Sequence, residues 1–416
     1  MPREIYSRTF TEDWDFRDSD TKDFTHSYHN YPAMMIPQIA RKLISEYAPN
    51  GAVDLIFDPY MGSGTTLVEA KINNINSVGT DLNPLARFIS EVKTTNFSVP
   101  DILQGISTIK SLLHNFNIDT YFCSKHITNS DFWYSKLNLA ELNFLSTEIE
   151  LLPNNILPFF KLALSECVRE VSYTRNGEFK RYRMAVDKLP DHNPDTFNLF
   201  FKKLKRNIKG LEQFNACQSN ASATISSFNS VDGIPSNILA DSSVDMVVTS
   251  PPYGDSGTTV AYGQFSRWAN EWFKFDNAKN IDNLLMGGSK INEFVLKTVS
   301  ISEQLSDIKN VDAKRYKEVL FFLDDYYRSI TNVAKTVRLG GRVCYVVGNR
   351  NVKGVQIPLD YFTIETFESN GFTHIDTFVR CIPNKRMPSK TSPSNVKGAN
   401  VSTMSNEFII IMEKTN

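Results

Sequence analysis

The feature of this chain that most limits its fold is a strand, a glycine loop and a helix in direct succession. Residues Asp58–Thr66 read Asp-Pro-Tyr-Met-Gly-Ser-Gly-Thr-Thr and follow an apolar run at residues 53–57. Gly62 and Gly64 let the backbone turn tightly against a ligand before a helix begins near Thr65. The string lacks the Gly-x-Gly-x-x-Gly of a dinucleotide site and the Gly-Lys-Ser/Thr of a P-loop. We therefore expect neither a pyrophosphate nor a triphosphate as its ligand.

A second short string follows another apolar run. Thr249–Tyr253 reads Thr-Ser-Pro-Pro-Tyr and comes directly after residues 244–248, which include Val244, Met246, Val247 and Val248. Taken alone, Pro-Pro-Tyr is typical of a rigid turn, because proline fixes φ and holds the preceding residue extended. In an open parallel sheet, however, ligands lie beyond the carboxyl ends of the strands where the winding direction reverses. We therefore predict that the two strings form one site, between the first and fourth strands.

Both strings resemble those of the DNA amino-methyltransferases, which use S-adenosyl-L-methionine (AdoMet) and carry an Asp-Pro-Phe-x-Gly-Ser-Gly-Thr loop and a Ser/Asn/Asp-Pro-Pro-Tyr/Phe loop. The resemblance implies an α/β fold: a Rossmann-like class I methyltransferase doubly wound sheet with an antiparallel last strand. Serine at position 250 resembles the N4-cytosine branch. It implies a site-specific DNA methyltransferase that acts on a flipped cytosine in a restriction-modification system.

The resemblance extends to the residues expected to hold AdoMet. Tyr31-Pro32-Ala33 is similar to a segment that closes over the cofactor in this family, although Met35 replaces the usual phenylalanine; the same stretch also suits a helix entry at Pro37. Asp81, at the end of a second strand, can accept hydrogen bonds from two ribose hydroxyls, and Asp81-Leu-Asn-Pro matches the family pattern. The expected cofactor-binding residues are Tyr31, Pro32, Ala33, Asp58, Tyr60, Gly62, Ser63, Gly64, Thr65, Thr66, Asp81, Leu82 and Asn83.

Charge and cysteine content restrict the setting. The formal net charge of -1 is unusual for a protein that binds double-stranded DNA, so contacts to phosphates must come from local basic patches. The five cysteines show no Cys-x-x-Cys spacing, which argues against zinc and against a disulfide framework. No apolar segment is long enough to cross a membrane. We expect a cytoplasmic protein without a metal, and a cognate restriction endonuclease sharing its target site is an expected partner.

The rhythm of strands and helices divides the chain into three parts. Residues 1–99 and 226–416 are predicted to form the AdoMet-binding catalytic core, and residues 100–225 a mostly helical insertion. The insertion carries a basic run at residues 175–183 and a lysine-rich helix at 202–209. We predict that it recognises the target, although such lysines are also typical of a solvated helix face. A long loop, 383–405, carries four further basic residues, namely Lys385, Arg386, Lys390 and Lys397.

The expected chemistry follows from the acceptor. An exocyclic base amine is a poor nucleophile, so the enzyme must accept its hydrogens and hold its nitrogen in line with the methyl donor. Ser250 Oγ and the Pro251 carbonyl are the predicted acceptors, Pro252 helps to fix their direction, and Tyr253 offers a ring for the flipped base. A cytosine-C5 mechanism is not expected, because no cysteine follows a proline.

Three alternatives stay open at this stage. N6-adenine methylation of DNA uses the same scaffold, RNA guanine-N2 methylation uses a similar loop and turn, and a non-catalytic regulator would be expected to lose part of Ser-Pro-Pro-Tyr, which is intact. Asp255 is not assigned to catalysis. The adenine contact that relatives make before the fourth strand is also unassigned, with Asn229, Ser230 and Asp232 as the nearest candidates.

Overall fold

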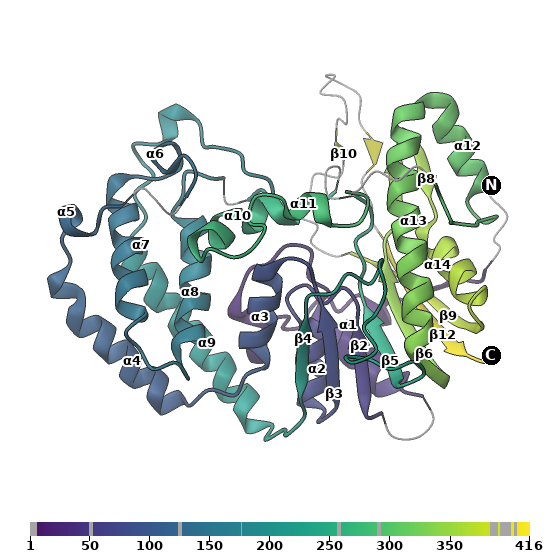
Figure 1. Cartoon of the computed structure of the whole chain (residues 1–416), viewed down its shortest axis with the longest axis horizontal. Coiled ribbons are helices and arrows are strands. Elements are labelled where there is room, and N and C mark those ends of the chain that lie inside the picture. Colours follow the sequence, from purple (N-terminus) through teal and green to yellow (C-terminus); the bar gives the residue numbers. More distant parts are fainter. Residues whose placement is uncertain are drawn as a thin grey trace.

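The computed structural model describes residues 6–49, 53–123, 127–175, 177–255, 259–288, 293–382, 390–391, 401–402 and 406–416. Among these residues, an eight-stranded sheet with the order β1-β9-β12-β6-β5-β2-β3-β4 forms the centre of the molecule (Figure 1). Its strands are β1 (Thr9–Phe10), β2 (Leu55–Asp58), β3 (Asn76–Thr80), β4 (Ala223–Ser226), β5 (Val244–Thr249), β6 (Val337–Val347), β9 (Phe372–Cys381) and β12 (Asn406–Lys414).

The sheet reverses its winding direction between β2 and β5. β2 pairs in parallel with β3 on one side and with β5 on the other, and β5 pairs in parallel with β6. β12 lies between β6 and β9 and is antiparallel to both. The predicted doubly wound α/β sheet with an antiparallel last strand is therefore confirmed, and so is the adjacency of the first and fourth predicted strands.

Helices cover both faces of the sheet, because successive strand residues point to opposite sides. Ile56 packs in an apolar cluster with residues of α1, whereas its neighbour Phe57 packs in the cluster on the opposite face with α13 and α14. Pro37 occupies the first turn of α1, as predicted. The core helices are α1 (Pro37–Glu46), α2 (Thr65–Ile72), α3 (Pro84–Thr94), α10 (Tyr262–Trp272), α11 (Ile281–Leu284), α12 (Ser302–Val311), α13 (Ala313–Thr336) and α14 (Leu359–Glu368).

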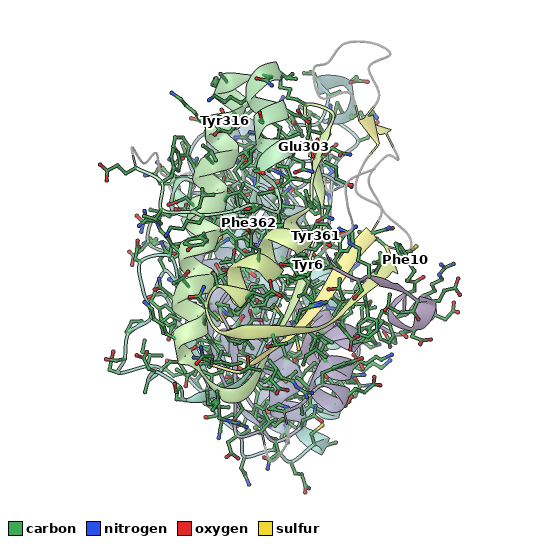
Figure 2. All side chains as sticks on the ribbon, turned by 90° about the vertical axis from the view of Figure 1, so that its right-hand side faces the viewer. Tyr6, Phe10, Glu303, Tyr316, Tyr361 and Phe362 are labelled. Carbon is green, nitrogen blue, oxygen red and sulfur yellow. The ribbon has the colours of Figure 1, made fainter. Side chains whose placement is uncertain are left out.

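The N-terminal segment covers the far edge of the sheet. β1 pairs in parallel with β9, the Tyr6 ring lies 5.6 Å from the Tyr361 ring of α14, and the Tyr6 hydroxyl donates to Glu368 at 2.7 Å (Figure 2). A short hairpin of β7 (Arg350–Val352) and β8 (Val355–Ile357) follows β6. The loop 383–405, which carries the four further basic residues noted in the sequence, lies outside the described residues except for β10 (Lys390–Thr391) and β11 (Val401–Ser402), which pair with each other.

The insertion forms a helical lobe beside the sheet (Figure 1). Its apolar core is continuous with α3 and α10 through Ile89 and Trp268. Its predicted end at residue 225 is wrong, because Ala223–Ser226 form β4, which pairs in parallel with β3. This short, half-exposed strand has no apolar run that would have revealed it. The helices of the lobe are α4 (Val99–Leu112), α5 (Ile118–Tyr121), α6 (Ser130–Trp133), α7 (Lys136–Ile149), α8 (Leu157–Glu170) and α9 (Thr196–Ala216).

Candidate active site

The glycine loop turns between β2 and α2 with two glycines in the left-handed region. Gly62 and Gly64 have φ values of 49° and 75°. A Cβ at position 64 would stand 2.7 Å from Ser90 Oγ, whereas a Cβ at position 62 would meet nothing closer than 3.9 Å. Gly64 therefore lets α3 pack against the loop, whereas a Cβ at Gly62 would make only ordinary contacts with Tyr31 and Tyr60.

Asp81 directly follows β3 and faces this loop. Its Oδ2 accepts a hydrogen bond from the Gly62 N–H at 3.1 Å, and its Oδ1 accepts one from the Asn83 N–H at 2.7 Å. Desolvation raises the pKa of Asp81 to about 6, against the effects of these bonds and of Arg87. Each carboxylate oxygen keeps a lone pair after these bonds, so Asp81 can accept hydrogen bonds from ligand hydroxyls.

Tyr31 is held near the carboxyl end of β3 by a hydrogen bond from Asn83. Asn83 Oδ1 caps α3 by accepting from the Leu85 N–H at 3.2 Å, and its Nδ2 donates to the Tyr31 hydroxyl at 2.9 Å. The Tyr31 ring stacks on that of Tyr262, with centroids 6.0 Å apart. The segment before α1 is thereby held next to the start of α10, although the two are far apart in sequence.

A cavity of about 1020 Å³, counted with the open space at its mouth, connects the two predicted loops. Thirteen of the predicted site residues line it, namely Tyr31, Pro32, Ala33, Asp58, Tyr60, Gly62, Ser63, Thr65, Asp81, Leu82, Asn83, Ser250 and Pro252. Gly64, Thr66, Pro251 and Tyr253 are not among the lining residues. Thr66 instead donates from Oγ1 to the Val248 carbonyl at 3.1 Å, a contact that joins α2 to β5.

Several lining residues were missed or left unassigned by the sequence. Phe228, Asn229 and Ser230 follow β4 and line the cavity; the last two were candidates for the adenine contact, but without β4 nothing placed them at the site. Tyr262 and Met286 also line it, and no sequence signal pointed to Met286. The cavity wall is therefore built from the ends of β2, β3, β4 and β5 together with the start of α10.

The Ser-Pro-Pro-Tyr loop is anchored by residues of β12 and β9, which lie beyond β6 in the sheet. Ser250 Oγ lies 3.1 Å from the Tyr253 hydroxyl, which donates to Glu407 Oε1 at 3.0 Å. Arg380 Nη1 donates to Glu407 Oε2 at 2.7 Å. Burial, followed by the charge of Glu407, raises the pKa of Tyr253 well above its ordinary value, so the phenol keeps its proton.

Asp255 has structural partners rather than a place in the cavity wall. Its Oδ2 forms ion pairs with Arg315 at 3.3 Å and Arg350 at 3.2 Å. Arg350 also packs directly beneath Gly254, where a Cβ would stand 1.8 Å from Arg350 Nη1. These contacts fix the loop just beyond Tyr253.

Two arginines of the basic run pack on aromatic rings of α10 and α6. The Arg181 guanidinium lies 4.8 Å from the Trp268 ring, and that of Arg183 lies 4.2 Å from the Phe132 ring. Arg175 is exposed, as is the ring of Tyr182. The two stacked arginines therefore attach this segment to α10 and α6, which leaves the exposed residues of the run as the surface that can meet a polyanion.

Comparison with known proteins identifies the family. The family model described as DNA methylase matches residues 3–90. Type II methyltransferase M.MvaI from Kocuria varians is 37% identical over 96% of this chain and 93% of its own length, and M.BsoBI from Geobacillus stearothermophilus is 24% identical over 85% and 79%. The solved rRNA methyltransferase AviRa from Streptomyces viridochromogenes aligns over 91% of this chain and 86% of its own, with 10% identity and a TM-score of 0.33. This chain belongs to the DNA methylase family of type II DNA methyltransferases.

Enzymes of this family take their methyl group from AdoMet, and the cavity residues fit that molecule. Asp81 has acceptor capacity for ribose hydroxyls, and the wall includes the aromatic rings of Phe228 and Tyr262. Ser63 Oγ is buried with no hydrogen-bond partner among the described residues, and it too lines the cavity. A buried hydroxyl without a partner is costly unless a ligand completes it. The carboxylate of Asp81, the two rings and the Ser63 hydroxyl are therefore the groups that suit AdoMet.

Two further features concern the described residues alone. They contain no helix that is long and apolar enough to span a membrane. They also contain no cluster of three or more His, Cys, Asp and Glu side chains suited to hold a metal ion.

Proposed function

We propose that this DNA methyltransferase transfers the methyl group of AdoMet to the exocyclic N4 amine of a cytosine flipped out of double-stranded DNA. The observation that carries the proposal is the position of Ser250, which follows β5 and lines the same cavity as the glycine loop of the adjacent strand β2. A serine, rather than aspartate or asparagine, opens the Pro-Pro-Tyr turn. This residue favours cytosine over adenine as the target base.

The proposed roles follow from the groups at this loop. AdoMet supplies an electrophilic methyl group when bound. Ser250 Oγ and the Pro251 carbonyl accept the two amine hydrogens, which directs the nitrogen lone pair toward the cofactor side of the cavity. Proline at 251 and 252 restricts the turn. The ring of Tyr253 remains the proposed stacking surface for the base, although its hydroxyl is engaged with Ser250 and Glu407.

Recognition of flanking bases is assigned to the insertion. Its basic run is attached to α10 by Arg181 on Trp268, and α10 begins at Tyr262 in the cavity wall. A surface joined so directly to the site can hold DNA while one base is extruded. A type II enzyme of this kind is also proposed to act beside a restriction endonuclease that shares its target sequence.

The substrate class is tested by offering the purified protein duplex DNA and RNA in parallel with methyl-labelled AdoMet. Label in DNA alone agrees with the proposal. Label in RNA with none in DNA would favour guanine-N2 methylation of RNA. In DNA, Ser250→Ala should reduce the single-turnover rate strongly and leave AdoMet affinity unchanged, because the missing acceptor matters most in the transition state. A wild-type rate in that variant would overturn the proposed role of Ser250.

A further inference from the structure

No sequence signal connects Glu407 of β12 and Arg380 of β9 with the Ser-Pro-Pro-Tyr loop, which Glu407 contacts through Tyr253. They are direct cross-strand partners in the antiparallel pair of β12 and β9. Glu407 Oε2 accepts from Arg380 Nη1 at 2.7 Å, and the Arg380 side chain is 5% exposed. Arg380 Nη2 also donates to the Asp15 carbonyl at 3.3 Å. Arg380 is thus held by the Asp15 carbonyl, and it in turn holds the Glu407 carboxylate that contacts Tyr253.

The Glu407 carboxylate determines the direction of each hydrogen bond in the series Glu407, Tyr253 and Ser250. A carboxylate ion-paired with arginine can only accept hydrogen bonds, so the Tyr253 hydroxyl must donate its single proton to Glu407 Oε1. Once that proton is committed, the phenol oxygen can only accept. The hydroxyl of Ser250, 3.1 Å away, must then donate to Tyr253.

This order decides what Ser250 offers to the cavity. With its proton directed to Tyr253, Ser250 Oγ presents lone pairs to any group in front of it. An amine on a base carries two hydrogens and no available lone pair in its ground state, so an oriented acceptor suits it, whereas a hydroxyl pointing its proton into the cavity would oppose it. Hydrogen bonds in such a chain also reinforce one another.

We propose that Glu407, held by Arg380, is a positioning residue that acts through Tyr253 to keep the Ser250 hydroxyl in its accepting orientation. The inference rests on the proposed function of Ser250 as the acceptor of the target amine. It assigns a role in catalysis to the antiparallel strand β12, whose first described residues follow the long loop between β9 and β12.

The critical variant is Glu407→Gln, which keeps size and shape. Its amide oxygen must face Arg380, so its NH₂ group must donate to Tyr253, and the phenol must then donate to Ser250. The serine proton is driven into the cavity. We expect kcat to fall by about tenfold or more, the effect of removing one transition-state hydrogen bond and putting an opposed proton in its place, while AdoMet affinity and the KM for DNA stay within twofold.

The matched control is Glu413→Gln. Glu413 lies on the same strand and is also a cross-strand partner of an arginine, Arg342, at 3.1 Å, but it has no contact with the loop among those the structure shows for the described residues. We expect its kcat to stay at the wild-type level. A fall as large as that of Glu407→Gln would mean that the decrease is a general effect of breaking ion pairs on β12, and would overturn the proposal.

A double-mutant cycle with Tyr253→Phe separates positioning from folding. Phenylalanine keeps the ring and removes the relay, so Glu407→Gln added to Tyr253→Phe should change kcat less than twofold. An equal fall in both backgrounds would show that Glu407 acts without Tyr253 and would overturn the inference. If Glu407→Gln fails to fold, the proposal is tested with Tyr253→Phe alone. In that variant kcat should fall while KM stays unchanged, and an unchanged kcat would contradict the proposal. Failure of the proposed function is recognised separately, by a wild-type rate in Ser250→Ala.

Discussion

The Thr249 hydroxyl donates a hydrogen bond of 2.6 Å to the carboxylate of Asp58. Thr249 ends β5 and Asp58 ends β2, so this bond joins the two strands at the edge where both loops leave the sheet. Asp58 also accepts from the Tyr60 N–H at 3.1 Å. Desolvation raises the pKa of Asp58 to about 6, and the bond from Thr249 opposes that rise. The contact therefore joins the first residue of the cofactor loop to the residue before Ser250.

Replacing Thr249 with valine should destabilise the fold by about 1–3 kcal/mol, because a buried carboxylate loses a donor. The matched control is Thr25→Val: Thr25 Oγ1 is equally buried and has no hydrogen-bond partner among the described residues, so this change should be close to neutral. Urea unfolding measures both. Equal destabilisation in the two variants would show that the Asp58 bond contributes nothing specific.

The cofactor site is tested on protein without DNA. Calorimetry should show stoichiometric AdoMet binding that is abolished by Gly62→Asp, since a charged side chain would enter the cavity at a position with positive φ. Asp81→Ala should weaken it, because the ribose loses its acceptor. Asp241→Ala, at an exposed carboxylate remote from the cavity wall, should bind like the wild type. Unchanged affinity in the first two variants would rule the site out.

AdoMet affinity should depend on pH through Asp81, whose pKa is about 6. Below that pH the protonated carboxyl loses acceptor capacity, so the dissociation constant should rise as pH falls from 7 to 5. The stability of the ligand-free fold responds to this group with the opposite sign: its raised pKa stabilises the folded state at low pH, and that contribution is lost as pH rises through about 6. Asp58 titrates in the same range and contributes with the same sign to stability.

Asp81→Asn isolates the effect on binding. Its AdoMet affinity should be weaker at pH 7 and flatter between pH 5 and 7 than that of the wild type. A pH profile as steep as the wild-type profile would assign the dependence to another group, with Asp58 as the first candidate.

The insertion is tested by the salt dependence of DNA binding. Because Arg181 and Arg183 stack on rings, the informative change is at Arg175, which is exposed. If the Arg175 side chain neutralises one phosphate, Arg175→Ala should lower the slope of log affinity against log salt by about 0.9, with AdoMet binding unaffected. The paired control changes Lys205 and Lys209, exposed on α9, and should keep the wild-type slope. The reverse result would move recognition to α9.

The sequence predicted the parts of this site that are local in the chain. The loop after Phe57 and the turn after Val248 each follow an apolar strand pattern, and sheet topology alone places parallel strand ends at one edge. β4 was not predicted, because its sequence Ala-Thr-Ile-Ser is short and only half buried and therefore shows no apolar strand pattern. Without it, Asn229 and Ser230 had no strand end to place them.

Contacts made across the fold could not be predicted in this way. Tyr253 and Glu407 are 154 residues apart and meet only because β12 is inserted between β6 and β9. In the basic run, the sequence shows that Arg181 and Arg183 are charged. It does not show that they stack on the rings of Trp268 and Phe132, because this stacking depends on how the lobe packs. Side-chain partners at such separations follow from tertiary packing rather than from local pattern.

The most direct test of this mechanism identifies the methylated base itself. DNA treated with the enzyme and AdoMet is digested to nucleosides and analysed by mass spectrometry. With Ser250 as the acceptor for a flipped cytosine amine, the digest should contain N4-methylcytosine and no 5-methylcytosine, and Ser250→Ala should remove most of the product. N6-methyladenine in its place would keep the fold and the cofactor site but contradict the assignment of cytosine to Ser250.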